Sequence, residues 1–117
     1  MTATLQSLIG GRWIGKEANT PLHSALTSKL IYHTHAEQID FDEAVTYARK
    51  TGVPGLMKLD FQVRAQRLKA LALYLMERKE ELYKISHLTG ATRPDSWVDV
   101  EGGIGTLFAY ASMGSRE

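Results

Sequence analysis

Three carboxylates near the end of the chain have the spacing that acid–base chemistry uses. Asp95 and Asp99 are four residues apart and would share one face of a helix, and Glu101 follows two residues later. Two carboxylates on one face can act as general acid and general base. Carboxylates in the first turns of a helix are also stabilised by its N-terminal dipole. Their position at the start of a helical pattern favours this structural interpretation over a catalytic one, and we predict no catalytic residue here.

Three histidines give the pattern of a possible metal site. His33 and His35 would point to the same face of a strand, and His23 would lie across a hairpin from them. Three imidazoles can bind zinc. The chain has no cysteine, and no carboxylate cluster accompanies these residues. We therefore favour scattered surface histidines and predict no metal site; for His87 we expect a surface or half-buried position.

Three glycines interrupt an apolar run, "VEGGIGTLFAY". A dinucleotide-binding turn needs a strand, then the glycines, then a helix. Here the preceding residues have helical spacing, and Phe108 occupies the place of the last glycine in G-x-G-x-x-G. We therefore predict no phosphate loop and no cofactor-binding residue. Because each glycine costs a helix roughly 1 kcal/mol relative to alanine, we expect Gly102, Gly103 and Gly105 to accommodate a neighbouring helix or strand, with room for a bulky ligand as the alternative.

A group of basic residues on the helical part of the chain has the composition of a nucleic-acid-binding stripe. Glu77, Glu80 and Glu81 interleave with these cations and would cancel much of their potential. A solvated face with local salt bridges is therefore favoured over nucleic-acid binding. We likewise expect Trp97, Phe108 and Tyr110 to pack rather than to stack on bases. The cations are Arg64, Arg67, Lys69, Arg78, Lys79 and Lys84.

Composition bounds the remaining possibilities. The chain has 117 residues, 44% of them hydrophobic and 23% charged, which is enough for one ordinary globular domain. Fourteen Lys and Arg against thirteen Asp and Glu leave a net charge of +1, which gives no reason to expect nucleic acid or a membrane as partner. The absence of cysteine excludes disulfides and thiolate catalysis within these residues. With neither a signal peptide nor a long apolar run, the chain is expected to be cytoplasmic.

The elements that would position these residues divide at about residue 38. Residues 1–38 are predicted to be β-rich, with two short strands around Gly10 and Gly11 in "LQSLIGGRWIG" and one further extended segment over "HSALTSKLIYHTHAE". Residues 39–117 are predicted to be helical. The expected fold is therefore α+β and mostly α: an N-terminal β-hairpin region followed by three or four helices.

Capping residues mark where the helices begin. Asp40 with Glu43 and Thr92 with Asp95 have the spacing of capping boxes, and Asp60 is a third N-cap. Gly52 and Pro54 are expected to end the first helix, and residues 77–81 to mark a bend or a new start in the second. The predicted apolar stripes are Phe41, Ala44, Val45 and Ala48; Leu68, Leu71, Ala72 and Leu75; then Trp97, Val100, Ile104, Leu107, Phe108 and Ala111.

With these motifs in view, the chain resembles the N-terminal part of the aldehyde dehydrogenase family. "LIGGRWIG" is similar to the family's opening hairpin, "AVTYAR" to the core of its first helix, and "FQVRAQRLKALALYLMERKEELYKISHLTGATR" to the segment that follows. The resemblance covers essentially the whole chain, in order and spacing. Residues 89–92, Thr-Gly-Ala-Thr, depart from the family's usual Thr-Gly-Lys. Residues 95–117 resemble instead the bifunctional branch, in which a hydratase domain follows the dehydrogenase domain and acts in phenylacetate degradation.

This resemblance implies an enzyme that oxidises a CoA-linked semialdehyde with NADP, after hydrolysis of an oxepin-CoA ring. The family's cysteine nucleophile, glutamate base and nucleotide-binding residues match no position here, so residues 1–117 alone are expected to be inactive and not to bind NADP tightly. The expected partner is the remainder of the dehydrogenase domain, within a homo-oligomer. The resemblance also places Gly102 and Gly103 beside the substrate tunnel.

Other classes of protein stay open from the residues themselves. A small stand-alone helical interaction module is the alternative to an enzyme fragment, and a weak nucleic-acid binder is a third. If the chain is a fragment, its apolar stripes lack their cover, and we expect exposed apolar surface and self-association.

Overall fold

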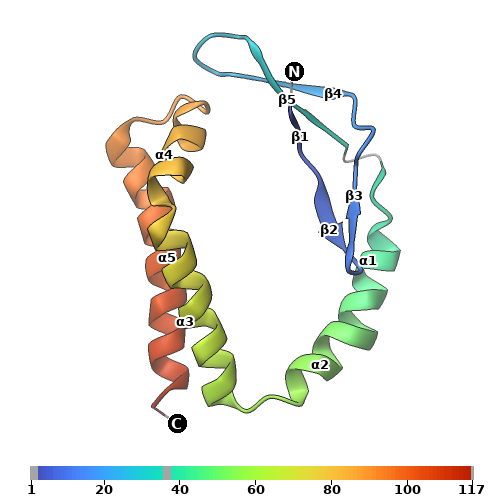
Figure 1. The fold of residues 1–117 in the computed structure, drawn as a ribbon, viewed down its shortest axis with the longest axis vertical. Coiled ribbons are helices and arrows are strands. Elements are labelled where there is room, and N and C mark those ends of the chain that lie inside the picture. Colours follow the sequence, from blue (N-terminus) through green and yellow to red (C-terminus); the bar gives the residue numbers. More distant parts are fainter. Residues whose placement is uncertain (1–2, 36–37, 117) are drawn as a thin grey trace. The chain divides into compact units, whose positions relative to one another are not determined.

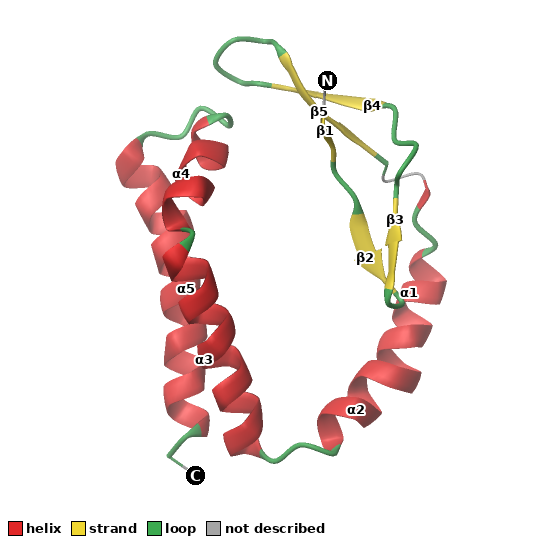
Figure 2. Cartoon of the chain, viewed as in Figure 1, coloured by secondary structure: helices red, strands yellow, loops and turns green. Residues whose placement is uncertain are grey.

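A computed structural model describes residues 3–35 and 38–116 of the protein. The chain divides into two compact units, Met1–Gly55 and Leu56–Glu117. The strands belong to the first unit and the long helices to the second (Figure 2). This arrangement confirms the predicted α+β, mostly helical fold with an N-terminal hairpin region.

The first unit contains the predicted glycine hairpin. Strands β2 (Ser7–Ile9) and β3 (Arg12–Ile14) pair antiparallel, with Leu8 opposite Trp13. Gly10 and Gly11, between them, have φ values of 59° and 75°. Both central residues of a type I′ turn need positive φ, which glycine adopts without a steric penalty. The sequence prediction of two strands around this turn is confirmed.

A second sheet completes the strands of this unit. Its order is β1 (Ala3–Thr4), β5 (Leu30–Thr34) and β4 (Thr20–His23), with β1 parallel and β4 antiparallel to β5. The prediction of one extended segment over residues 23–37 was wrong, because the chain reverses at Ser24. The buried Ser24 hydroxyl accepts hydrogen bonds from the backbone N–H groups of Leu26 (3.2 Å) and Thr27 (3.4 Å), which stabilise the turn. Ala36 and Glu37, also in that segment, lie outside the described residues.

One glycine of this unit lies directly against a histidine ring. Gly15 has φ +98°, and a Cβ added to it would stand 2.0 Å from Nδ1 of His35. His35 is only 4% exposed, and neither ring nitrogen has a hydrogen-bond partner among the described residues. The expectation that the histidines are scattered on the surface was therefore wrong for His35. Its ring is buried because Gly15 leaves room for it.

The helix after Asp40 runs further than predicted. It begins at α1 (Phe41–Tyr47), passes through a π-helical segment, η2 (Ala48–Gly52), and continues as α2 (Val53–Met57). Gly52 and Pro54 were expected to end it. Gly52 does not have positive φ, and Pro54, the second residue of α2, directly follows the π-helical segment and its C-cap Val53.

The start of α1 is capped as predicted, but the capping box is only half formed. The Asp40 carboxylate accepts the Glu43 N–H at 2.9 Å, whereas the Glu43 carboxylate pairs with Arg12 of the hairpin at 2.5 Å. The predicted burial of the first stripe was also wrong: Phe41 is 66% exposed. Val45 of the same stripe is also exposed, whereas Ala44 is half-buried.

The second unit is built from three helices, α3 (Phe61–Glu77), α4 (Lys79–His87) and α5 (Arg93–Gly114). The Asp60 carboxylate caps α3 by accepting the Val63 N–H at 2.7 Å, and Thr92 with Asp95 forms the predicted capping box of α5. The helix is interrupted at Arg78, between α3 and α4, inside the predicted range of 77–81. These helix starts are all confirmed.

Small side chains let α3 and α5 pack side by side (Figure 1). Ala65 and Ala72 of α3 are buried, as are Ile104 and Ala111 of α5. Gly114 lies where a Cβ would be 3.0 Å from the Cβ of Ala65. The predicted stripe on α3 is partly wrong, since Ala72 is fully buried but Leu71 is 47% exposed. The expectation that Trp97 and Tyr110 pack was also wrong, because both side chains of α5 are exposed. The contact between these helices uses alanine and glycine rather than leucine.

Replacing Gly15 by alanine tests the packing of His35. The φ of +98° and the 2.0 Å approach to the imidazole ring should together lower the free energy of unfolding of the first unit by more than about 2 kcal/mol. The measurement is hydrogen exchange of the backbone amides of β4 and β5. Gly52→Ala is the matched control, because a Cβ there meets no atom within 4 Å. Equal protection in the two variants would contradict the assignment.

Candidate functional site

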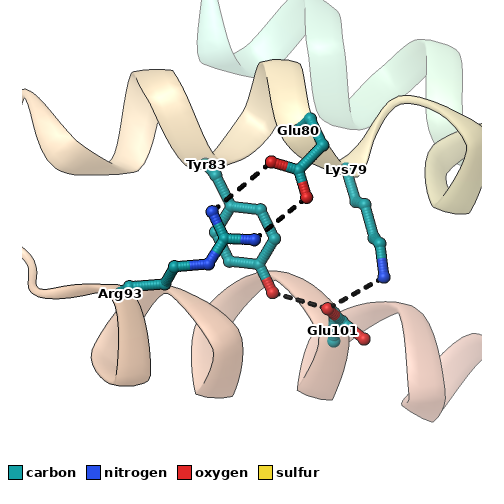
Figure 3. Close-up of polar contacts among 5 residues, drawn as sticks. All are labelled: Lys79, Glu80, Tyr83, Arg93 and Glu101. Atoms are coloured by element: carbon teal, nitrogen blue, oxygen red, sulfur yellow. Dashed lines mark hydrogen bonds and ion pairs between the residues drawn. The ribbon is translucent and has the colours of Figure 1, made fainter.

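A group of hydrogen-bonded polar side chains joins α4 to α5. We call it the α4–α5 cluster; it consists of Lys79, Glu80, Tyr83, Arg93 and Glu101 (Figure 3). The Tyr83 hydroxyl donates to Glu101 Oε1 at 2.5 Å, and Lys79 Nζ lies 3.2 Å from the same oxygen. The Arg93 guanidinium donates to both carboxylate oxygens of Glu80, at 3.0 and 3.4 Å. It also lies 4.5 Å from the centre of the Tyr83 ring.

These contacts shift the pKa values of Tyr83, Arg93 and Glu101 so that the two ion pairs of the cluster are favoured at neutral pH. The hydrogen bond to Glu101, burial and the negative charge of Glu101 raise the pKa of Tyr83 to about 12. The hydrogen bond from Tyr83, followed by that from Lys79, lowers the pKa of Glu101. The Glu80 carboxylate raises the pKa of Arg93. At neutral pH each charged group of the cluster therefore has a partner of opposite charge, and Tyr83 is a neutral donor.

The three carboxylates that the sequence offered as an acid–base group have separate surroundings. Asp95 accepts hydrogen bonds from the Thr92 hydroxyl (2.6 Å) and N–H (3.2 Å), which lower its pKa. Glu101 belongs to the α4–α5 cluster, and Asp99 is exposed. The arrangement anchors the start of α5 and ties it to α4, in agreement with the structural interpretation of Asp95 and Glu101.

A cavity of about 330 Å³ adjoins the α4–α5 cluster, with Tyr83, His87 and Arg93 in its wall. His87 is exposed, as expected, and its Nδ1 lies 3.3 Å from the carbonyl oxygen of Ala91. Two cationic side chains line the cavity: Arg93, which is paired with Glu80, and Lys84, which is exposed.

The glycine run lies inside α5, which spans it without interruption and thereby confirms the prediction of a helix in place of a phosphate loop. No described heavy atom lies within 4 Å of a Cβ added at Gly102, Gly103 or Gly105. The expectation that another helix or strand approaches these glycines is therefore wrong for the described residues. The glycine that does permit a close approach is Gly114. Sequence reasoning missed it, although it continues the stripe of Ile104, Leu107 and Ala111 at helical spacing.

Three of the six cations in the predicted basic stripe contact other groups of the chain. Arg64 Nε donates to the Leu59 carbonyl oxygen at 3.0 Å, and the Arg78 guanidinium lies 3.7 Å from the centre of the Tyr74 ring. Lys79 pairs with Glu101. These contacts agree with local pairing on a solvated face and lower the charge available to a phosphate backbone.

Among residues 3–35 and 38–116, no three histidine or carboxylate side chains come together in a way that could hold a metal ion. Within the same ranges, no helix combines the length and apolar character needed to cross a membrane.

The order of these elements and motifs is that of a known family. Residues 13–117 match the aldehyde dehydrogenase family, and the chain belongs to it. The chain is also 32% identical over 112 residues to a 3,4-dehydroadipyl-CoA semialdehyde dehydrogenase of Aromatoleum evansii. The aligned region is 94% of this chain but 22% of that relative, so the chain spans about a fifth of the length of the curated relative it matches.

Replacing Tyr83 by phenylalanine tests the α4–α5 cluster through pH. Because the pKa of Glu101 is lowered in the folded state, its contribution to stability is present above the ordinary glutamate pKa and is lost as pH falls through the folded value. The raised pKa of Tyr83 gives a contribution that is lost as pH rises through about 12. Tyr83→Phe should therefore be less stable than wild type at about pH 7, with a smaller difference at about pH 3.

Urea unfolding at the two pH values measures this difference. Tyr110→Phe is the matched control, because Tyr110 is exposed on the same helix as Glu101. The cluster would have no energetic role if both variants differed from wild type by the same amount at every pH.

Proposed function

We propose that residues 1–117 form the N-terminal part of an NADP-dependent enzyme that oxidises a CoA-linked semialdehyde to the acid. The observation that carries the proposal is the family match over residues 13–117. The similarity to a relative named for a CoA-linked semialdehyde supports the substrate class. Because the chain contains no cysteine, the nucleophile of the proposed enzyme belongs to another part of its polypeptide.

The glycine run of α5 does not have the geometry of a dinucleotide-binding turn. Gly102, Gly103 and Gly105 lie within α5 rather than between a strand and a helix, and none has positive φ. A dinucleotide-binding turn requires the glycine backbone to bend toward the pyrophosphate at a helix N-terminus. In the proposed enzyme NADP is therefore held by other segments, and residues 1–117 support the domain that binds it.

The exposed apolar side chains support the proposal that a larger body covers this part of the enzyme. Phe41 of α1, Phe61 of α3 and Trp97 of α5 are all exposed. Helix α5 carries no charged residue between Glu101 and its end at Gly114, and a helix that is apolar on all sides is normally buried. The proposed cover is the remainder of the dehydrogenase domain, within a homo-oligomeric enzyme.

The finer assignment is to the bifunctional branch of the family. In that assignment the enzyme is cytoplasmic, acts in phenylacetate degradation and carries an oxepin-CoA hydrolase domain after the dehydrogenase. Its support is the resemblance of residues 95–117, including the unusual glycine run in "VEGGIGTLFAY". The substrate that the complete enzyme turns over distinguishes this branch from a dehydrogenase without the second domain.

Reconstitution tests the proposed division of labour. Purified residues 1–117 should neither oxidise an aldehyde nor bind NADP tightly, because the chain supplies no thiol and no dinucleotide turn. Adding the separately expressed remainder of the enzyme should restore CoA-semialdehyde oxidation, measured by NADPH absorbance. Turnover by residues 1–117 alone would overturn the proposal. A cooperatively folded monomer that restores no activity would favour a stand-alone interaction module.

The open space at Gly102 and Gly103 generates a second test in the complete enzyme. We propose that these glycines widen the substrate tunnel for a CoA-linked chain, since a Cβ at either position meets no described atom within 4 Å apart from the nearby backbone of α5 itself. Gly102→Leu should raise KM for the CoA semialdehyde by roughly tenfold or more, the scale set by burying or blocking one large apolar contact, and should spare a small aldehyde. Gly55→Leu, at another open glycine, is the matched control. Equal effects on both substrates would argue against the tunnel assignment.

A further inference from the structure

Helix α5 contacts a different helix on either side of its glycine run (Figure 1). Before the run, the Tyr83 hydroxyl of α4 donates to Glu101. After the run, Ile104 is buried, and Gly114 lies where a Cβ would be 3.0 Å from the Cβ of Ala65 in α3. The change of partner therefore falls between Glu101 and Ile104.

The polar contacts follow the same division. Among the residues that the structure describes, every side-chain hydrogen bond or ion pair between α4 and another helix involves residues 93–101 of α5. The buried Ser96, for example, donates to the hydroxyl of Ser86 at 2.9 Å. We call α4 with residues 93–101 the α4 body, and α3 with residues 104–114 the α3 body.

The chain passes between the two bodies at two places. One is Arg78, between α3 and α4, which has φ −107° and ψ 11° and provides no side-chain cap for α4. The other is the pair Gly102 and Gly103 within α5. Lys79 directly follows the first connection, and its Nζ lies 3.2 Å from Oε1 of Glu101, which directly precedes the second. The two connections therefore lie side by side.

The glycine connection is weak for local reasons. Glycine destabilises the interior of a helix relative to alanine, because it loses more conformational freedom on folding. The Thr106 hydroxyl donates to the carbonyl oxygen of Gly102 at 3.0 Å. Such a bond to the carbonyl four residues earlier competes with the helical hydrogen bond and bends helices. Helix α5 is thus intrinsically weakest where its partner changes.

We propose that Arg78 and the Gly102–Gly103 pair form a hinge between the α4 body and the α3 body. Hinges are a few positions that absorb a change of backbone angles while the elements on either side stay rigid. Bending here breaks none of the described side-chain hydrogen bonds or ion pairs of α4, since each of them lies within the α4 body.

The hinge goes beyond the proposed function. The contacts that define the two bodies lie within the second unit, so they do not depend on what covers α5 elsewhere. In the proposed enzyme Gly102 and Gly103 border the substrate tunnel, and bending would change its width there; this consequence alone rests on the proposed function. The hinge is measured without turnover. Its failure would leave the dehydrogenase assignment untouched, and failed reconstitution would leave the hinge untouched.

Hydrogen exchange of backbone amides in the complete protein tests the hinge, with mass spectrometry as the readout. Bending at Gly102 and Gly103 breaks the helical hydrogen bonds that span them, which are donated by the N–H groups of residues 103–107. These amides should exchange at least about tenfold faster than those of residues 108–111 in the same helix.

Alanine at the glycine pair should stiffen the hinge. Gly102→Ala and Gly103→Ala, combined in one chain, should slow the exchange of residues 103–107 by about fivefold for each glycine replaced. Gly55→Ala is the matched control, because it adds a Cβ to another helix at a position with no described atom within 4 Å apart from the nearby backbone. It should leave these rates unchanged.

Tyr83→Phe separates the two bodies. Loss of the hydrogen bond to Glu101 should speed the exchange of residues 79–87 at least about threefold and leave residues 61–77 of α3 unchanged. A purely structural role for Tyr83 in one cooperative unit would speed both helices by the same factor.

Three results would each overturn the hinge. In the unmodified protein, residues 103–107 exchange no faster than the rest of α5. The two alanines leave the rates unchanged, or Gly55→Ala slows them as much. Tyr83→Phe speeds α3 as strongly as α4. The exchange profile of the unmodified protein keeps the test decisive even where a variant does not fold.

Discussion

The close contact between α3 and α5 is the constraint on which the second unit depends. Ala65, Ala72 and Ala111 are buried there, and Gly114 has no room for a larger side chain beside Ala65. Because the residues in contact are small, the axes of the two helices approach closely and their longer side chains are directed elsewhere. Leu71 and Trp97 are exposed as a result. The same packing that holds the helices together thus leaves large apolar side chains on the outside.

The α4–α5 cluster completes this unit at its other end. It ties a nine-residue helix, too short to be stable alone, to the long helix α5 through one tyrosine, two acids and two cations. The ion pairs Lys79–Glu101 and Arg93–Glu80 contribute modestly to stability, because solvent screens their charges. The Tyr83 hydroxyl differs from them, since its residue is buried and its hydrogen bond to Glu101 is short. Polar contacts therefore position α4, while apolar contacts hold α3.

Local signals predicted the starts of elements well. Asp60 and Thr92 cap their helices, and Gly10 with Gly11 turns the hairpin, because a cap or a tight turn depends on only a few adjacent residues. Tertiary features were missed for the converse reason. The helix that begins at Phe41 continues through a π-helical segment and past Pro54, and His35 is buried against a glycine twenty positions earlier. Predicting either requires the path of the whole chain.

At the candidate site, Asp95 caps the start of α5 as the helix-start pattern favoured. Glu101 lies further along the helix, and its partners could not be read from spacing. Tyr83 and Lys79 reach Glu101 from another helix. The glycine run was assigned correctly to a helix, while its open side is visible only once the neighbours of α5 are known.

The contact between Gly15 and His35 also limits how this sequence can diverge. The imidazole occupies the volume that any side chain at position 15 would need. A smaller residue at position 35 would free that volume, but the backbone at position 15 would still have positive φ and would still favour glycine. Mutational drift is therefore asymmetric: position 35 can change first and alone, whereas position 15 can change only after it.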